Sequence, residues 1–405
     1  MIGGFMGFTV HNEVLLLVFL VALVIGAVGN KTNFCTMGAV SDWVNMGDTG
    51  RMRAWLFAIA IALTGLLLFE IMGAVTLPSD SFPPYRTSNF AWLRYVLGGL
   101  LFGVGMTLGS GCGQRTMVRV GQGNLKSLVV LIIAAICAYL MLWTDFFSIV
   151  FMSWINPTTI ELSKYGIPSQ EIGTIVGGVF NIKNTQLLHW LIGGVVALTL
   201  FVFIFKSPDF RSRFDNFLGG GVMGLAVVAG WYITGGALRE AWEEYAAFAT
   251  TIPSRVAVQS YTFISPMGDT ARYLMQPAQT TMINFGVMAL TGVIIGSFLY
   301  AIFTRKFRIE WFASKSDFLN HAVGGSLMGF GGVLAMGCTI GQGVTGVSTL
   351  ALGSVLALVS IIFGSALTMK VQYYMLDEQG FWRALHMGLA DMKLLPASGG
   401  TKTPA

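Results

Sequence analysis

Long apolar runs separated by short polar turns extend over most of the chain. Nine of these runs are long enough, or nearly long enough, to cross a bilayer, which takes about 20 residues of helix. They lie near residues 14–29, 54–77, 91–111, 127–151, 187–205, 217–234, 282–303, 321–337 and 348–370. The runs at 14–29 and 321–337 are short and lead directly into polar turns, as half-helices that end inside a membrane protein do. The pattern predicts an all-α polytopic membrane protein with about nine long helices plus broken or re-entrant half-helices.

One glycine-rich stretch occurs twice in the chain. Residues 98–112 read GGLLFGVGMTLGSGC and residues 324–338 read GGSLMGFGGVLAMGC, with eight identities at a constant offset of 226. Both copies end in Gly-Cys and are followed by polar residues. Glycine at this density disfavours an uninterrupted helix and lets a backbone approach another group closely. We predict that both copies are broken helices that end where the backbone lines a cavity.

The composition supports a membrane protein. Hydrophobic residues make up 54% of the chain and charged residues only 11%, with a mean hydropathy of +0.70. Soluble domains carry roughly 25% charged residues, so an ordinary soluble domain is excluded. The net charge of +5 is modest and mostly carried by loops. We therefore interpret it as a signal of membrane topology and predict no nucleic-acid partner.

The distribution of lysine and arginine predicts the orientation of the chain, because cytoplasmic loops are enriched in these residues. The connectors 152–186 and 239–281 are long and sparsely basic, so we place both outside, together with the N-terminus. The two glycine-rich copies then run in opposite directions, which defines an inverted repeat. The cytoplasmic clusters are Arg51/Arg53, Arg115/Arg119/Lys126, Lys206/Arg211/Arg213 and Arg305/Lys306/Arg308.

This interpretation divides the chain into two membrane repeats of opposite topology. The predicted units are a first repeat at 1–151, an external connector at 152–186, an inverted second repeat at 187–372 and a cytoplasmic tail at 373–405. Residues 26–42 and 224–240 match more weakly at an offset of 198, with Ile233 facing Cys35. We predict that four loops converge at the centre, around 30–37, 111–118, 230–236 and 337–343.

Three of the four cysteines fall in these loops. Cys35, Cys112 and Cys338 lie at polar turns, whereas Cys137 lies in the middle of an apolar run and is expected to be a small core residue. A thiol is a weak hydrogen-bond donor with a polarisable sulfur, and the start of a half-helix adds backbone donors suited to an anion. Because the centre offers few carboxylates, a sulfur-containing anion fits better than a cation. The predicted substrate-binding residues are Cys35, Thr36, Gly111, Cys112, Gln114, Gly337, Cys338, Thr339 and Gln342.

Other charged residues in or beside the apolar runs leave alternatives open. Glu70 and Asp145 lie inside runs, where an ionisable group is a functional hypothesis by default, although both would also meet water near the outer interface. Arg115 and Arg119 follow Cys112 directly and serve as a positive-inside anchor, as an electropositive exit for an anion, or as both. We predict no catalytic residue, metal ligand or cofactor.

The turns NKTNFCTMGAVSDW and LLFGVGMTLGSGCGQRTMVRVGQGN resemble the signatures of the YeeE/YedE family of membrane proteins. The resemblance covers roughly residues 14–370. It implies an hourglass-shaped helical fold with buried loops meeting at the centre, and thiosulfate uptake in which loop cysteines contact the passing anion. By motif these cysteines are Cys35, Cys112 and Cys338, and the chain departs from the pattern at Ile233. Because some relatives are associated with selenium metabolism, a selenium compound is an alternative substrate.

These observations predict a multi-pass transporter of a bacterial inner membrane that takes up thiosulfate or a related inorganic sulfur anion. It would contact membrane lipid, and a cytoplasmic sulfurtransferase is left open as a partner. We predict that the protein is not an enzyme. The alternatives are a thiol-dependent sulfurtransferase or oxidoreductase, with Cys112 or Cys338 as nucleophile, and a passive channel or lipid-facing structural protein.

Overall fold

The structure, a computed structural model, describes residues 9–395 except 80 and 250. It is almost entirely helical, and the described residues form a single sheet of two short strands, β1 (Asn89–Phe90) and β2 (Ile160–Glu161). The long helices are α1 (Val10–Thr32), α3 (Gly50–Ile71), α4 (Trp92–Leu108), α6 (Leu125–Trp143), α9 (Thr185–Phe205), α11 (Phe214–Gly235), α14 (Phe285–Phe303), α15 (Lys315–Leu334) and α16 (Leu352–Leu376). The predicted all-α polytopic fold is confirmed.

Shorter helices lie between the long ones. The segments that matter for the centre are α2 (Thr36–Ser41) with its π-helical continuation η1 (Asp42–Met46), α5 (Gly113–Gly121), α13 (Ile264–Met275) and the π-helix η6 (Thr339–Gly346). The remainder are α7 (Ser153–Ile155), α8 (Ile172–Val179), α10 (Pro208–Arg211), α12 (Arg239–Phe248), α17 (Phe381–Asp391) and the single turns η2 (Ser148–Met152), η3 (Asn156–Thr158), η4 (Leu162–Tyr165) and η5 (Thr280–Met282).

Nine segments of the described chain are long and apolar enough to cross a membrane, as the nine apolar runs predicted. Three of them include a short helix as well as a long one: Val10–Met46, Trp92–Gly121 and Lys315–Gly346. A long helix followed by a shorter one is the broken-helix arrangement expected from the polar turns. The protein is therefore a multi-pass membrane protein.

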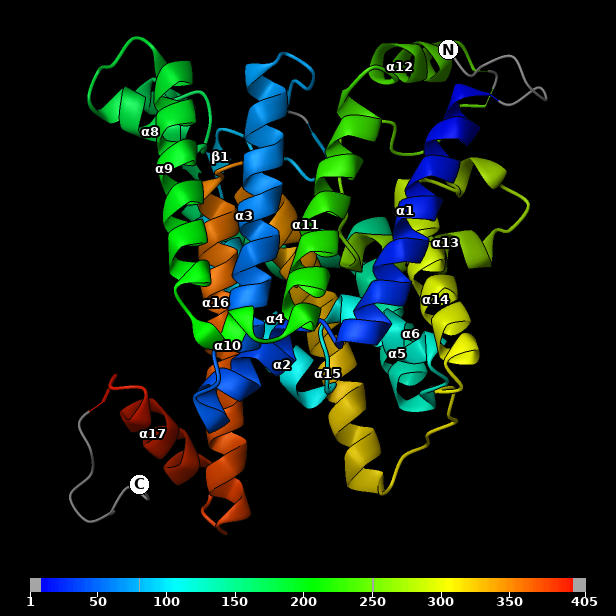
Figure 1. Cartoon of the computed structure of the whole chain (residues 1–405), viewed down its shortest axis with the longest axis vertical. Coiled ribbons are helices and arrows are strands. Elements are labelled where there is room, and N and C mark those ends of the chain that lie inside the picture. Colours follow the sequence, from blue (N-terminus) through cyan, green and yellow to red (C-terminus); the bar gives the residue numbers. More distant parts are fainter. Residues whose placement is uncertain (1–8, 80, 250, 396–405) are drawn as a thin grey trace.

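The helices alternate in direction between two faces of the molecule (Figure 1). We call the face that carries α8 and α12 the upper face, and the face that carries α10 and α17 the lower face. The four basic clusters lie toward the lower face, at the start of α3, around α5, around α10 and after α14. The described part of the predicted tail, up to residue 395, also lies there, while residues 396–405 fall outside the described residues.

The lower face is expected to be cytoplasmic, because basic loops remain on that side of a membrane. A single cysteine at Ala247 of α12 should react with an impermeant maleimide in intact cells, on a background without the four native cysteines. A cysteine at Lys393, beyond α17, should react only after permeabilisation. Both side chains are exposed, so accessibility within the protein does not limit labelling. The reverse pattern would overturn the predicted orientation.

The two glycine-rich copies form an antiparallel helix pair at the core of the molecule. A side chain at Gly105 of α4 would lie 2.7 Å from the backbone nitrogen of Met328 on α15. A side chain at Gly331 of α15 would lie 2.6 Å from the backbone nitrogen of Phe102 on α4. The two contacts are the same contact with the copies exchanged, since 226 residues separate each position from its counterpart. The close approach of the two backbones thus has local two-fold symmetry and explains why both copies are rich in glycine.

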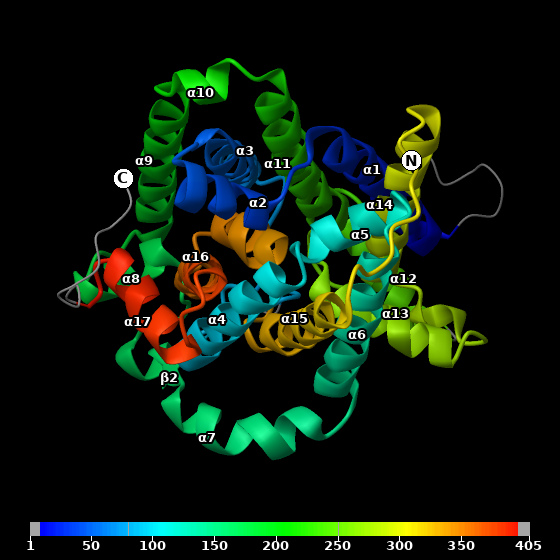
Figure 2. The same ribbon diagram turned by 90° about the horizontal axis from the view of Figure 1, so that it is seen from below.

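The helices around this pair follow a matching arrangement. Close glycine contacts join α1 to α14 and α11 to α3, in each case with the two helices parallel. Helix α9 lies outside these pairs, against α3 (Figures 1 and 2). The order of elements from α11 to α16 therefore parallels the order from α1 to α6, with α9 as an additional helix. The division into two repeats at 1–151 and 187–372 stays a prediction.

A charged network on the upper side ties several elements together. Glu70 at the end of α3 forms a salt bridge with Arg86, at 2.5 Å, and lies 3.0 Å from His189 of α9. The other imidazole nitrogen of His189 lies 2.8 Å from Glu171, which caps α8. Burial alone would raise the pKa of the Glu171 carboxyl, but hydrogen bonds from His189 and Thr174 hold that pKa below its usual range.

The Glu70→Gln substitution should destabilise the protein, because it leaves the largely buried guanidinium of Arg86 without its carboxylate. Breaking one side of a buried ion pair costs about 3–5 kcal/mol. We expect a clear fall in the melting temperature of the detergent-purified protein. The matched control is Asp145→Asn, since Asp145 also lies inside a predicted apolar run but its side chain is exposed. Equal melting temperatures for the two variants would show that the network contributes no stability.

Candidate functional site

The three turn cysteines occupy the same position in three helix breaks. Each is the residue that precedes a short helix: Cys35 precedes α2, Cys112 precedes α5 and Cys338 precedes η6. Two residues before each cysteine, the backbone adopts the left-handed conformation, with φ of 52° at Asn33, 58° at Ser110 and 57° at Met336. This reverses the chain at the end of the long helix. The breaks predicted around 30–37, 111–118 and 337–343 are thus present.

The fourth predicted break was placed wrongly. Helix α11 runs without interruption through Gly235, so Ile233 lies inside a helix and does not face Cys35 at a turn. The fourth central segment comes from residues 256–263, which lead into α13 and belong to the connector predicted to be wholly external. Residues 258–269 of this connector are buried. The segment Gln-Ser-Tyr-Thr at 259–262, followed by Pro266 in the first turn of α13, was the signal that could have indicated it.

The four segments converge on one buried centre. The guanidinium of Arg115 donates to the Asn33 side chain at 2.8 Å, which joins the first break to the second. The hydroxyl of Thr345 in η6 donates to the Tyr261 carbonyl at 2.6 Å, which joins the fourth segment to the third break. A side chain at Gly341 of η6 would lie 2.8 Å from Cβ of Thr262, so this approach requires glycine. The convergence of four segments is therefore present, with 256–263 in place of 230–236.

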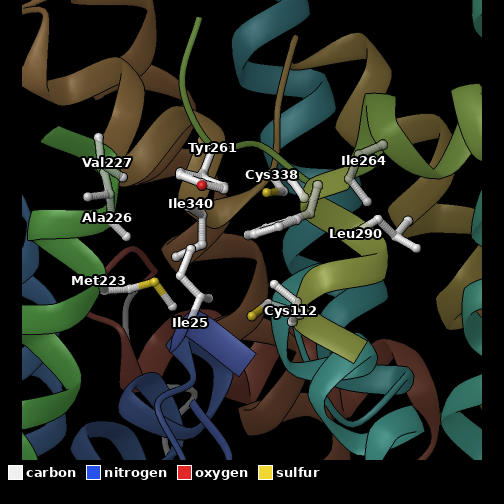
Figure 3. Close-up of a cluster of buried hydrophobic side chains, with 14 of the residues drawn as sticks. Ile25, Cys112, Met223, Ala226, Val227, Tyr261, Ile264, Leu290, Cys338 and Ile340 are labelled. Atoms are coloured by element: carbon white, nitrogen blue, oxygen red, sulfur yellow. The ribbon is translucent and has the colours of Figure 1, made fainter. Parts of the chain in front are cut away.

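The cysteines lie close to one another at this centre. Cys35 and Cys112 are near enough for their thiols to interact, and the Thr339 hydroxyl is close to Cys112. In Figure 3 Cys338 lies on the side of Val227 and Cys112 on the side of Met223, with Ile25 and Ile340 beside them. All three cysteines are closed off from solvent, with exposed fractions of 7%, 1% and 0% for Cys35, Cys112 and Cys338.

Several buried polar atoms around the centre have no hydrogen-bond partner in the described part of the chain. They are the hydroxyls of Thr36, Thr262 and Thr339 and both amide atoms of Gln114. Native proteins satisfy most of their buried polar groups, since an unsatisfied one costs about 1–3 kcal/mol. Such a concentration of unsatisfied groups is typical of a site that receives a polar ligand. Three of the four residues were predicted from the sequence, and Thr262 was not.

The other predicted site residues have structural roles in the breaks. The Gln342 amide donates to the Ala335 carbonyl at 2.7 Å and accepts from Ser354 at 2.6 Å, so its polar atoms hold the break together. A side chain at Gly337 would lie 3.1 Å from Cγ of Gln342, and one at Gly111 would lie 3.2 Å from Cγ of Arg115. Both glycines therefore keep the chain reversal compact beside the cysteines.

The short helices direct their starting ends toward the centre. Cys338 illustrates the geometry, because its sulfur accepts from the backbone nitrogen of Gly341 at 3.4 Å and its S–H remains free to donate. The starts of α5, α13 and η6 add backbone donors and positive electrostatic potential.

A carboxylate close to the first break, Asp42 beyond the end of α2, is neutralised by a salt bridge with Arg51. Among the described residues no group of three or more His, Cys, Asp and Glu is arranged to hold a metal ion. The centre accordingly presents thiols, hydroxyls and backbone N–H groups as weak donors.

A polytopic helical protein with broken helices that meet at a buried, donor-lined centre has the architecture of a membrane transport protein. The sequence comparison places it more narrowly: the chain belongs to the sulphur transport family, which it matches over residues 31–367. The resemblance seen in the sequence motifs is thus confirmed, and the protein is a sulfur-compound transporter by family.

Two relatives are similar to this chain over most of their length. The chain is 25% identical to the thiosulfate transporter TsuA of Escherichia coli (strain K12) over 357 residues, which cover 84% of this chain and 89% of that protein. It is also 25% identical to the thiosulfate transporter TsuA of Spirochaeta thermophila over 355 residues, which cover 85% of this chain and 95% of that protein.

Proposed function

We propose that this protein takes up thiosulfate or a related inorganic sulfur anion across a bacterial inner membrane, through a path lined by Cys338, Cys112 and Cys35. The observation that carries the proposal is the equivalent position of the three cysteines, each buried at the start of a short helix. Thiosulfate has a terminal sulfur and charged oxygens. Thiols and backbone N–H groups offer weak donors to both.

Weak donors suit a transport path better than lysine or arginine would. A site in a permeation path must bind its substrate well enough to desolvate it and loosely enough to release it. The unsatisfied hydroxyls of Thr36, Thr262 and Thr339 supply further donors of moderate strength. The apolar side chains of Ile25, Met223 and Ile340 exclude water from the same space. An anion would therefore pass from one thiol to the next with partial replacement of its hydration shell.

The test is uptake by proteoliposomes that contain only this protein. Labelled thiosulfate should enter in a saturable manner, and sulfite, sulfide and selenite should be measured in parallel to define the substrate class. Linear, unsaturable entry would indicate a passive channel. Absence of thiosulfate entry, together with uptake of selenite, would assign the protein to a selenium compound.

The Gly337→Val substitution should reduce uptake strongly while the protein still inserts. The added side chain would meet Cγ and the backbone nitrogen of Gln342, at 3.1 and 3.3 Å from the first added carbon alone. Gln342 would have to move, and the Ala335 carbonyl and Ser354 would lose the amide that joins them. Uptake should be compared at equal membrane abundance with Gly194→Val, because no atom lies within 4 Å of that position on α9. Normal transport by Gly337→Val would show that the third break is not part of the path.

One observation favours an enzymatic alternative, a thiol-dependent sulfurtransferase or oxidoreductase. The thiols of Cys35 and Cys112 are close enough to interact. A thiolate that attacks the outer sulfur of thiosulfate would form a persulfide and release sulfite, and the neighbouring thiolate could then displace hydrosulfide to leave a disulfide. Mass spectrometry of the protein during turnover decides between the two functions. A persulfide or a Cys35–Cys112 disulfide that forms and decays at the turnover rate would support the enzyme, whereas thiols that stay unmodified would support transport by hydrogen bonding.

A further inference from the structure

A basic cavity opens between α5 and the loop that joins α14 to α15. These two segments lie side by side at the lower face, which Figure 2 views from below. Its volume is about 530 Å³. Five cationic side chains and one carboxylate line it: Arg115, Arg119, Arg305, Lys306, Arg308 and Glu310. A cavity with this lining concentrates positive potential in a confined space, which raises the local concentration of anions.

Most of the positive charge of the cavity is not neutralised by the described residues, because Glu310 is the single carboxylate among those that line it. None of its five cations forms an ion pair with a described carboxylate. The side chain of Glu310 accepts a hydrogen bond from Asn124. The buried Nη1 of Arg115 has no hydrogen-bond partner among the described residues, and the Arg119 guanidinium donates only to the Ser110 carbonyl. The cations are therefore available to a ligand.

Backbone hydrogen bonds hold the two walls of the cavity together. The backbone nitrogen of Arg308 donates to the Gln122 carbonyl at 3.0 Å, and that of Leu125 donates to the Glu310 carbonyl at 3.0 Å. The loop after α14 is thus fixed against the end of α5 and does not extend freely from the membrane surface. A loop whose only role is to anchor positive charge at the interface would not need this pairing.

Arg115 links the cavity to the cysteine centre. It lies three residues after Cys112, and its guanidinium donates to Asn33, two residues before Cys35. One side of the guanidinium therefore touches the first break, while the residue itself lines the cavity. An anion that leaves Cys35 and Cys112 toward the lower face would meet Arg115 next.

We propose that this cavity is a second anion site, which takes a free inorganic dianion such as thiosulfate or sulfate at the lower end of the path. Its place after the cysteines rests on the proposed transport function, but binding in the cavity does not. A lipid headgroup offers similar chemistry, yet every lining residue is polar or charged, so the cavity has no apolar wall for acyl chains. By contrast, an apolar groove with Arg53 and Lys370 at the same face has such walls, including Trp43 and Phe203.

Binding can be separated from transport with the triple variant Cys35→Ala, Cys112→Ala, Cys338→Ala in nanodiscs of phosphatidylcholine. This variant should still bind labelled thiosulfate saturably, with sulfate as a competitor and with weaker binding at high salt. Adding Arg305→Gln, Lys306→Gln and Arg308→Gln should weaken binding at least about tenfold. The matched control is Lys206→Gln, Arg211→Gln and Arg213→Gln, three exposed cations on the same face outside the cavity, which should leave binding unchanged.

Three results would overturn the proposal. They are no saturable binding by the cysteine-free variant, equal weakening by the two sets of charge substitutions, and loss of binding when phosphatidylglycerol replaces part of the phosphatidylcholine. The last result would assign the cavity to a lipid headgroup. If the cysteine-free variant does not fold, the number of thiosulfate ions bound per protein is measured instead on the chain with its native cysteines. There the cavity substitutions should remove one of two bound anions. A native protein that binds thiosulfate in the cavity but does not take it up would refute the proposed function and leave this site standing.

Discussion

Thiosulfate uptake should fall at least tenfold in Cys338→Ala, because one hydrogen-bond donor to a charged substrate is worth about 1.5–3 kcal/mol. In Figure 3 Cys338 lies on the side of Val227 and Cys112 on the side of Met223. Because α11 rises from the lower to the upper face (Figure 1), Cys338 is the nearer of the two to the upper face, and an anion entering from that side would meet it first. Its sulfur already accepts from the Gly341 backbone nitrogen, so the S–H is the group left to donate to an anion. Without the sulfur, the incoming anion would lose the first donor that replaces its water.

The matched control is Cys137→Ala. Cys137 is as buried as Cys35 but lies in the middle of α6, where its Cβ packs against Gly329 of α15. Both substitutions remove one small group, so both should leave the melting temperature and the membrane abundance nearly unchanged. Uptake should be lost in Cys338→Ala and retained in Cys137→Ala. Equal uptake by the two variants would show that the Cys338 thiol has no role in transport beyond packing, which would contradict the proposed cysteine-lined path.

The sequence was sufficient to locate three of the four central segments, because each contains a long apolar helix, a polar turn and a cysteine. The repeat at an offset of 226 residues can be recognised in the sequence itself. The structure explains why both copies are rich in glycine: the backbones of α4 and α15 lie so close together that a larger side chain would meet the opposite backbone. A contact of this kind requires several glycines at fixed spacing, which is easy to recognise in a sequence. The predicted positions of Cys112 and Cys338 followed directly from it.

The fourth segment left no comparable mark. Residues 256–263 are extended or irregular and are surrounded by a polar connector, so neither helical periodicity nor hydropathy distinguishes them. Their burial depends on contacts distant in sequence, such as the hydrogen bond from Thr345 to the Tyr261 carbonyl. Gln342 illustrates a second reason why the sequence is insufficient. From the sequence its amide is expected to donate to the substrate beside Cys338, but in the structure the amide is already hydrogen-bonded to the Ala335 carbonyl and to Ser354. Side-chain partners of this kind depend on the fold and are not visible in a motif.

The symmetric packing of α4 and α15 predicts that Gly105→Val and Gly331→Val will reduce the stability of the protein to the same extent. At Gly105 an added carbon would lie 2.7 Å from the Met328 nitrogen and 2.8 Å from the Gly324 oxygen. At Gly331 it would lie 2.6 Å from the Phe102 nitrogen and 2.8 Å from the Gly98 oxygen. In both cases the obstacle is backbone, which cannot rotate away as a side chain can, so the helices must separate. Overpacking usually costs about 1–3 kcal/mol, and more where the surroundings cannot relax.

Both variants should therefore yield little monodisperse protein after extraction into detergent, with similarly reduced melting temperatures for whatever folds. Gly194→Val on α9 serves again as the control, since it makes the same substitution on a helix without a neighbour at that position. Comparing Gly105→Val with Gly331→Val also tests whether the inverted repeat extends beyond the two glycine-rich copies. If the halves are related by a two-fold axis, which would account for the exchanged contacts of Gly105 and Gly331, the two losses should agree. A protein that tolerates one of these valines and not the other would restrict the symmetry to the sequence motif.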